Sequence, residues 1–142
     1  GGANDLGIKG CEEIIYKDFD LGFVAAGTGS TAAGIIKSQK VRSLKAVSSL
    51  KGDFLKEEIA SWVPEDNGWE LLSDYHFGGY AKYPKELKEF QEWFEREFGL
   101  LLDPVYTSKA FFAAFDYLEK NKELRDISVI LVHTGGLQGR KS

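Results

Sequence analysis

The residues with the clearest chemical potential form a short turn rich in glycine and hydroxyl side chains, Gly27–Thr31, with the sequence GTGST. The turn follows the apolar run 21–26 and precedes the small-residue run 32–36. This order is typical of a strand that passes through a turn into a helix, where backbone N–H groups and the helix dipole favour an anion. Glycines also let a phosphate approach the backbone closely. We predict a phosphate-binding turn here, with an ordinary strand–helix turn as the alternative.

A second glycine turn, His133–Gly136, follows another apolar run. The apolar periodicity predicts strands at 21–26, 43–49, 69–72 and 127–132, helices at 5–17, 28–38, 54–62, 84–98 and 108–120, and an aromatic, glycine-rich loop at 73–83. This alternation predicts an α/β fold, a three-layer domain with a mostly parallel sheet of about four strands. Ligands bind at the carboxyl ends of such strands, so we expect both glycine turns at one edge of the sheet.

Size and charge limit the classes of protein to consider. The chain has 142 residues, 43% of them hydrophobic, and a net charge of −4, which fits one globular domain and argues against a nucleic-acid partner. No apolar run reaches the ~20 residues needed to span a bilayer, and no signal peptide is recognisable, so no membrane partner is expected. The single cysteine, Cys11, excludes an internal disulfide and fits a cytoplasmic protein. No metal site is predicted.

The beginning of the sequence is unusual. It opens on Gly1 and contains no methionine, and about four strands are few for an open α/β sheet. We therefore expect the sequence to be part of a longer protein, a processed product or a trimmed chain.

Four segments, in this order, resemble a known enzyme family. They are residues 1–7 (GGANDLG), the turn 27–31, the segment 102–110 (LDPVYTSKA) and the turn 133–136 (HTGG). Over essentially its whole length the sequence is similar to the C-terminal half of the 1-aminocyclopropane-1-carboxylate deaminase and D-cysteine desulfhydrase family. These are enzymes dependent on pyridoxal 5′-phosphate (PLP), with the fold-type II architecture of tryptophan synthase β. The resemblance implies that residues 1–142 are the C-terminal part of the PLP-binding domain, and that the N-terminal half with the Schiff-base lysine is absent.

The resemblance also implies roles for single residues. Tyr80 and Tyr106 become the candidate catalytic residues, with Tyr83 as a second choice because the loop around Tyr80 is one residue longer than in relatives. Thr134 would face the pyridine nitrogen of the cofactor. The implied cofactor-binding residues are Gly27, Thr28, Gly29, Ser30, Thr31, Thr107, Thr134 and Gly135.

Two threonines bear on the choice of reaction. A hydroxyl at the pyridine nitrogen, as at Thr134, leaves the ring less charged than a carboxylate would and restrains carbanion chemistry. Family members that open the cyclopropane ring tend to carry a glutamate directly after the connector tyrosine, where this sequence has Thr107. That departure puts ring opening in doubt and favours a D-cysteine desulfhydrase-like elimination, or the reaction of an uncharacterised relative.

The chain is therefore predicted to be part of a PLP-dependent deaminase or desulfhydrase. Such an enzyme would act on a small amino acid, 1-aminocyclopropane-1-carboxylate or D-cysteine, and release ammonia and a 2-keto acid. The chain alone is expected to be inactive, and to self-associate or to pair with the complementary N-terminal half. The alternatives are a non-catalytic module that binds a phosphate ligand or a nucleotide, and an interaction domain with structural glycine turns. A dinucleotide site is disfavoured by the spacing of Gly34 from the turn.

Three further sets of residues are predicted to have no catalytic or binding role. Lys109 is expected on the solvated face of its helix, His133 in a structural hydrogen bond, and the aromatic face of helix 84–98 in the core.

Overall fold

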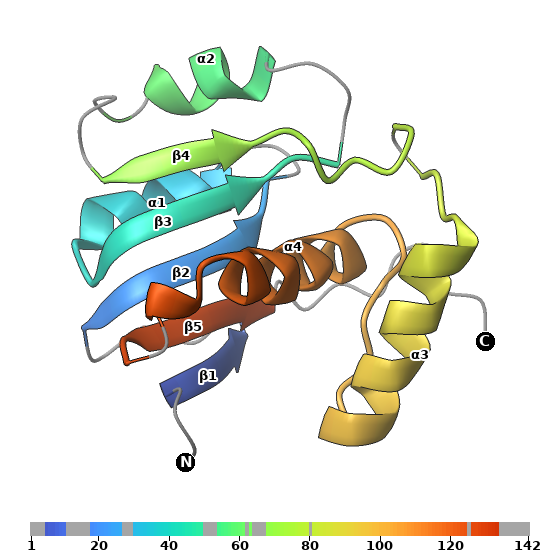
Figure 1. Cartoon of the computed structure of the whole chain (residues 1–142). Coiled ribbons are helices and arrows are strands. Elements are labelled where there is room, and N and C mark those ends of the chain that lie inside the picture. The colour runs from blue at the N-terminus through green and yellow to red at the C-terminus, as the bar shows by residue number, and fades with distance from the viewer. Residues whose placement is uncertain are drawn as a thin grey trace.

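The chain is described by a computed structural model that covers residues 5–10, 18–26, 30–49, 54–61, 63, 68–79, 81–124 and 126–133, with residues 5–10, 30, 31 and 54 described by backbone alone. In this part of the chain five strands form one sheet in which every neighbouring pair is parallel (Figure 1). In spatial order they are β1 (Asp5–Gly10), β5 (Ser128–His133), β2 (Phe19–Ala25), β3 (Val41–Val47) and β4 (Trp69–Leu72).

Helices cover both faces of the sheet and make three layers (Figure 1). One face carries α1 (Ser30–Ser38) and α2 (Phe54–Ala60), and the other carries α4 (Thr107–Lys120), on which α3 (Lys85–Phe98) packs; the short helix η1 (Lys122–Leu124) precedes β5. Strand β2 serves both cores, because Val24 packs with the α1 side while Phe23 and Ala25 pack with the α4 side. Burial on two faces explains the unbroken apolar run of this strand.

The predicted α/β fold class and all four predicted strands are confirmed, with boundaries shifted by at most two residues. The predicted helix 5–17 is wrong where the structure describes it, because residues 5–10 form β1; residues 11–17 lie outside the described residues. Gly7 and Gly10 weaken a helix here, and pairing of β1 with β5 from Asp5↔Ser128 to Gly10↔His133 supplies backbone hydrogen bonds that no local pattern reveals. This strand raises the sheet from about four strands to five.

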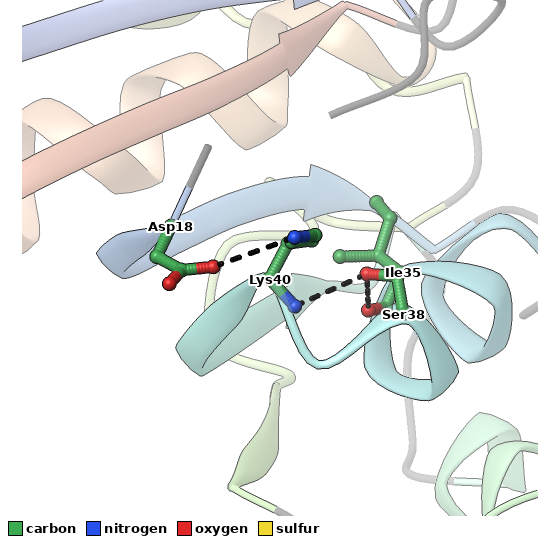
Figure 2. Close-up of polar contacts among 4 residues, drawn as sticks. All are labelled: Asp18, Ile35, Ser38 and Lys40. Atoms are coloured by element: carbon green, nitrogen blue, oxygen red, sulfur yellow. Dashed lines mark hydrogen bonds and ion pairs between the residues drawn. The ribbon is translucent and has the colours of Figure 1, made fainter. Parts of the chain in front are cut away.

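Helix α1 ends through a local hydrogen-bond arrangement shown in Figure 2. The Ser38 hydroxyl donates to the Ile35 carbonyl at 2.6 Å and accepts the Lys40 N–H at 3.3 Å. Gln39 then takes a positive φ of 59°, which turns the chain into β3. The Lys40–Asp18 ion pair spans 3.9 Å between exposed side chains, so it adds little stability.

Helix α3 begins one residue later than predicted, because Pro84 is its N-cap, and Gly99 ends it in the left-handed conformation. The expectation that its whole aromatic face lies in the core is only partly right. Leu87 and Phe94 are fully buried, whereas Trp93 and Phe98 remain 38% and 43% exposed. Helix α4 packs against this face. One helix is too narrow to cover all five large apolar side chains of the face, which are Leu87, Phe90, Trp93, Phe94 and Phe98.

A pair of glycine substitutions tests the packing of the central strand. A Cβ on Gly22 would lie 2.9 Å from Val41 and 3.2 Å from Ile130, whereas one on Gly34 would meet no atom within 4 Å. We expect Gly22→Ala to lower the free energy of unfolding by about 1–3 kcal/mol. Gly34→Ala, on an exposed helix position, should raise it by up to about 1 kcal/mol. Urea unfolding of both variants checks this, and an equal effect of the two would contradict it.

Candidate ligand site at the carboxyl edge of the sheet

The two predicted glycine turns follow neighbouring strands. Strands β2 and β5 are paired, with Val24 opposite Val132. The chain leaves β2 into α1 on one face, and it enters β5 from α4 on the opposite face (Figure 1). Such a reversal opens a crevice at the carboxyl ends of the strands, the usual ligand position in open α/β sheets. The expectation that both turns start from the same edge is confirmed by the strand pairing.

Five of the predicted cofactor-binding residues lie outside the described residues, namely Gly27, Thr28, Gly29, Thr134 and Gly135. Ser30 and Thr31 are the first two residues of α1, so they stand at the helix N-terminus that directly follows β2. Their predicted contacts stay predictions.

Two helix N-termini face this edge. Helix α1 starts there after β2, and α4 runs antiparallel to the strands, so its first turn reaches the same edge from the other face (Figure 1). The N-terminus of α1 carries a partial positive charge, whereas the first N–H groups of α4 are already bound by Asp103. The edge therefore favours a ligand with negative charge.

Two buried hydroxyl groups near this edge have no hydrogen-bond partner among the described residues. Ser49, directly after β3, is 2% exposed, and Ser108, in the first turn of α4, is fully buried. An unpaired buried hydroxyl costs free energy. Both groups are available to hydrogen-bond a ligand.

Tyr106, the first candidate catalytic residue, is the N-cap of α4 and half-buried. Its ring packs against the core between the sheet and the helices α3 and α4. Its backbone N–H donates to Asp103 Oδ1 at 2.7 Å, which fixes where the side chain leaves the backbone. The predicted role at the substrate stays a prediction.

Asp103 organises the turn that leads into α4. Its buried carboxylate accepts the N–H groups of Val105, Tyr106 and Thr107 at 2.9, 2.7 and 3.1 Å. It also accepts the Thr107 hydroxyl at 2.8 Å. Three orphan N–H groups of the helix entry are thereby satisfied by one side chain.

Thr107 is tied into the same arrangement. Its hydroxyl donates its one hydrogen to Asp103 Oδ2 and accepts the Asp103 N–H at 2.8 Å, and the side chain is fully buried. A hydroxyl has a single hydrogen, so Thr107 has none left to donate elsewhere. This geometry gives Thr107 a structural role, and the cofactor contact predicted for it stays a prediction.

Lys109 differs most from its prediction. The expectation of a solvated lysine is wrong, because the side chain is fully buried. Its Nζ donates to the His76 carbonyl at 2.8 Å and to the Gly79 carbonyl at 2.9 Å. Burial lowers the pKa of Lys109 from 10.5 to about 8. One sequence signal was available: positions 110–115 read AFFAAF, which leaves this part of the helix no polar face.

The loop that accepts these hydrogen bonds follows β4 and is otherwise fastened to α4. Tyr75 donates its hydroxyl to Asp116 Oδ2 at 2.7 Å, and Phe77 packs edge-on against Phe112 with 4.8 Å between ring centroids. Burial and the hydrogen bond to Asp116 raise the pKa of Tyr75. Tyr80, the second candidate catalytic residue, lies outside the described residues.

Two other candidates have structural partners. The Tyr83 hydroxyl donates to Gln91 Oε1 on α3 at 3.0 Å, which places this weaker alternative to Tyr80 beside α3. His133 is buried at the end of β5, and its Nε2 lies 2.7 Å from the Leu101 carbonyl. Because a carbonyl oxygen only accepts, Nε2 carries the hydrogen. The predicted structural hydrogen bond of His133 is confirmed.

The fold is an open α/β sheet with helices on both faces, and comparisons with known proteins narrow the class of protein. The chain is 32% identical to a protein of Pyrococcus furiosus and 34% identical to one of Pyrococcus abyssi, both named "Putative 1-aminocyclopropane-1-carboxylate deaminase". It is 28% identical to the bifunctional D-cysteine desulfhydrase/1-aminocyclopropane-1-carboxylate deaminase of Arabidopsis thaliana. Each match covers 98% of this chain, but 49%, 49% and 41% of the relative.

A solved structure agrees. The crystal structure of an ACC deaminase homologue superposes with a TM-score of 0.69 at 30% identity, over 85% of this chain and 41% of that one. No family model matches the sequence. Over almost its whole length the chain is similar to about half the length of proteins of the 1-aminocyclopropane-1-carboxylate deaminase and D-cysteine desulfhydrase family. It spans about half the length of the curated relatives it matches.

No helix among the described residues is both long and apolar enough to cross a membrane.

Proposed function

We propose that this chain forms the phosphate side of a PLP site in a deaminase or desulfhydrase that acts on a small amino acid. The observation that carries the proposal is the placement of the α1 N-terminus, at Ser30, beside the reversal between β2 and β5. The names of the relatives support the same reaction class.

The residues present fit a phosphorylated cofactor. The N–H groups at the start of α1 would bind the phosphate oxygens, assisted by the hydroxyls of Ser30 and Thr31. The unpaired buried hydroxyl of Ser49 follows β3, the strand next to β2, and can serve as a further donor. Bound there, PLP would supply an electron sink for the electrons of the substrate Cα. The chain's own contribution is to bind the phosphate, to orient the ring and to bury it.

The geometry around Thr107 bears on the substrate. We propose elimination from D-cysteine, which breaks a C–S bond, in preference to opening of the cyclopropane ring. Thr107 stands where ring-opening relatives tend to carry a glutamate, and its only hydrogen is used by Asp103. In the whole protein, we expect D-cysteine and water to be converted to hydrogen sulfide, ammonia and a 2-keto acid at least about tenfold faster than 1-aminocyclopropane-1-carboxylate is deaminated. Equal rates, or faster ring opening, would contradict this choice of substrate.

Binding of the aldehyde-free analogue pyridoxamine 5′-phosphate tests the phosphate site, because this analogue cannot condense with lysines. We expect it to bind at least about tenfold more tightly than pyridoxamine, which lacks the phosphate. Ser30→Ala combined with Thr31→Val should weaken binding by about threefold to tenfold. Calorimetric titration measures these affinities.

The matched control is Ser38→Ala at the opposite end of the same helix, where the hydroxyl donates to Ile35. It should leave the affinity unchanged. If pyridoxamine 5′-phosphate binds no better than pyridoxamine, or if the Ser38 variant weakens binding as much as the N-terminal one, the proposed phosphate site is wrong.

A further inference from the structure

We infer that Lys109 is a positioning residue, whose buried ammonium holds the loop backbone at His76 and Gly79 against the carboxyl edge of the sheet. The link to ligand binding rests on the proposed function above. The hold on the loop itself rests only on the geometry of the described residues.

The two carbonyls that Lys109 binds each begin a tight turn. The His76 carbonyl also accepts the Gly79 N–H at 3.2 Å, and the Gly79 carbonyl also accepts the Lys82 N–H at 3.1 Å. Lys109 Nζ therefore joins two consecutive turns at their first carbonyls. One side chain thus fixes the relative orientation of both turns.

The loop needs stabilising contacts because its backbone has an unfavourable conformation at several residues. Phe77 and Ala81 have positive φ angles of 55° and 62°, and Gly78 and Gly79 have φ angles of 98° and 125°. A positive φ costs free energy for residues with a Cβ. The hydrogen bonds from Lys109, together with the ring contact of Phe77, offset that cost.

No ion pair within the described part of the chain includes Lys109, although Asp116 on the same helix binds both Tyr75 and Lys120. In that part of the chain, the groups that stabilise the buried cation are the two carbonyl dipoles. A methionine would fill the same space without the desolvation cost of a charge, but it would leave two carbonyls with weaker pairing. Lys109 therefore supports the loop through the hydrogen bonds of its Nζ, and not through the volume of its side chain.

The position of the loop explains why its contact with Lys109 matters for the proposed ligand site. It continues from the carboxyl end of β4, and Lys109 lies three residues after Tyr106 in the first turns of α4. Lys109 therefore connects the start of α4 with the loop between β4 and α3. A change in the turns of this loop would alter the edge at which the proposed ligand binds.

Hydrogen exchange measured by NMR tests the inference without any ligand. In Lys109→Met, we expect the amides of Gly79 and Lys82 to exchange about tenfold to a hundredfold faster relative to the sheet amides of Ala26 and Ser48. Lys88→Met, at an exposed position on α3, is the control and should leave the ratio unchanged. An unchanged ratio in Lys109→Met would show that the side chain acts by packing alone and would overturn the inference.

Chemical rescue separates the amine from the side-chain volume. The only cysteine of the chain is Cys11, so a Cys11→Ser, Lys109→Cys chain can be alkylated at one position while unfolded and then refolded. Bromoethylamine restores an amine at the position of Nζ, whereas bromopropane restores the length without it. Only the aminoethyl form should recover slow exchange of Gly79 and Lys82. Recovery by both forms would contradict the inference.

Two measurements guard against ambiguous results. If the uncharged forms do not fold, direct detection of Lys109 Nζ in the unmodified chain decides the matter: scalar coupling to the carbonyl carbons of His76 and Gly79 is expected, and its absence overturns the inference. In the folded variants, the affinity for pyridoxamine 5′-phosphate should fall by about threefold to tenfold in Lys109→Met. Faster loop exchange with unchanged affinity would refute the link to the site. If no form binds the analogue, the proposed function fails while the exchange result still judges the loop.

Discussion

Replacing Asp103 with alanine is expected to lower the free energy of unfolding by about 3–4 kcal/mol, the largest effect of any single polar substitution proposed for this chain. The carboxylate is 2% exposed and accepts three backbone N–H groups and one hydroxyl. Removal of the carboxylate leaves these donors without a hydrogen-bond acceptor at the entry of α4. Urea unfolding at constant m-value measures the loss.

Two further variants give the Asp103 prediction its controls. Asp103→Asn keeps one oxygen for the N–H groups of Val105 and Tyr106 but turns an NH₂ toward Thr107, so an intermediate loss of about 1–2 kcal/mol is expected. Thr107→Val should cost about 1–2 kcal/mol and should couple to Asp103→Ala in a double-mutant cycle. Additive effects, or a loss below about 1 kcal/mol for Asp103→Ala, would show that water replaces the carboxylate without difficulty.

Raising the pH from about 8 to 10 is expected to stabilise the fold through Lys109 by about 2 kcal/mol. Burial lowers the pKa of this lysine to about 8 in the folded chain, against 10.5 for an ordinary lysine. Between these values the unfolded state binds a proton that the folded state lacks, and stability rises with pH wherever that holds. The neutral amine keeps two N–H donors, so both carbonyls of the loop stay paired.

The difference in stability between the wild type and Lys109→Met isolates this contribution from the other lysines. Chemical unfolding at several pH values should show the gap moving in favour of the wild type up to about pH 9.5. Above pH 10, Tyr75 acts in the opposite direction, because burial and its hydrogen bond to Asp116 raise its pKa and the unfolded tyrosine ionises first. Tyr75→Phe removes that opposing trend. Parallel pH profiles of wild type and Lys109→Met would contradict the prediction.

Local pattern was enough for most elements of the fold. The unbroken apolar run of β2 and the alternation of strands with helices identified a parallel sheet, because strands buried on both faces leave no polar positions. Gly99 marked the end of α3 because a left-handed residue is required there. Strand β1 was not predicted from the sequence. It lies at the edge of the sheet and takes its hydrogen bonds from β5, which is more than a hundred residues away in the chain.

The candidate site divides in the same way. Strand order explains why the two glycine turns belong together: both follow strands whose carboxyl ends meet, and this could be expected from the sequence. The resemblance to the family was also found from the sequence, on four short segments, and the names of the relatives agree with it. The tasks of Asp103, Thr107 and Lys109 were decided by the tertiary structure alone. Each depends on which backbone groups are left unpaired after packing: the entry of α4 for the first two, and the turns at His76 and Gly79 for Lys109. A residue type states what a side chain can donate or accept, but only the folded chain decides which partner is within reach.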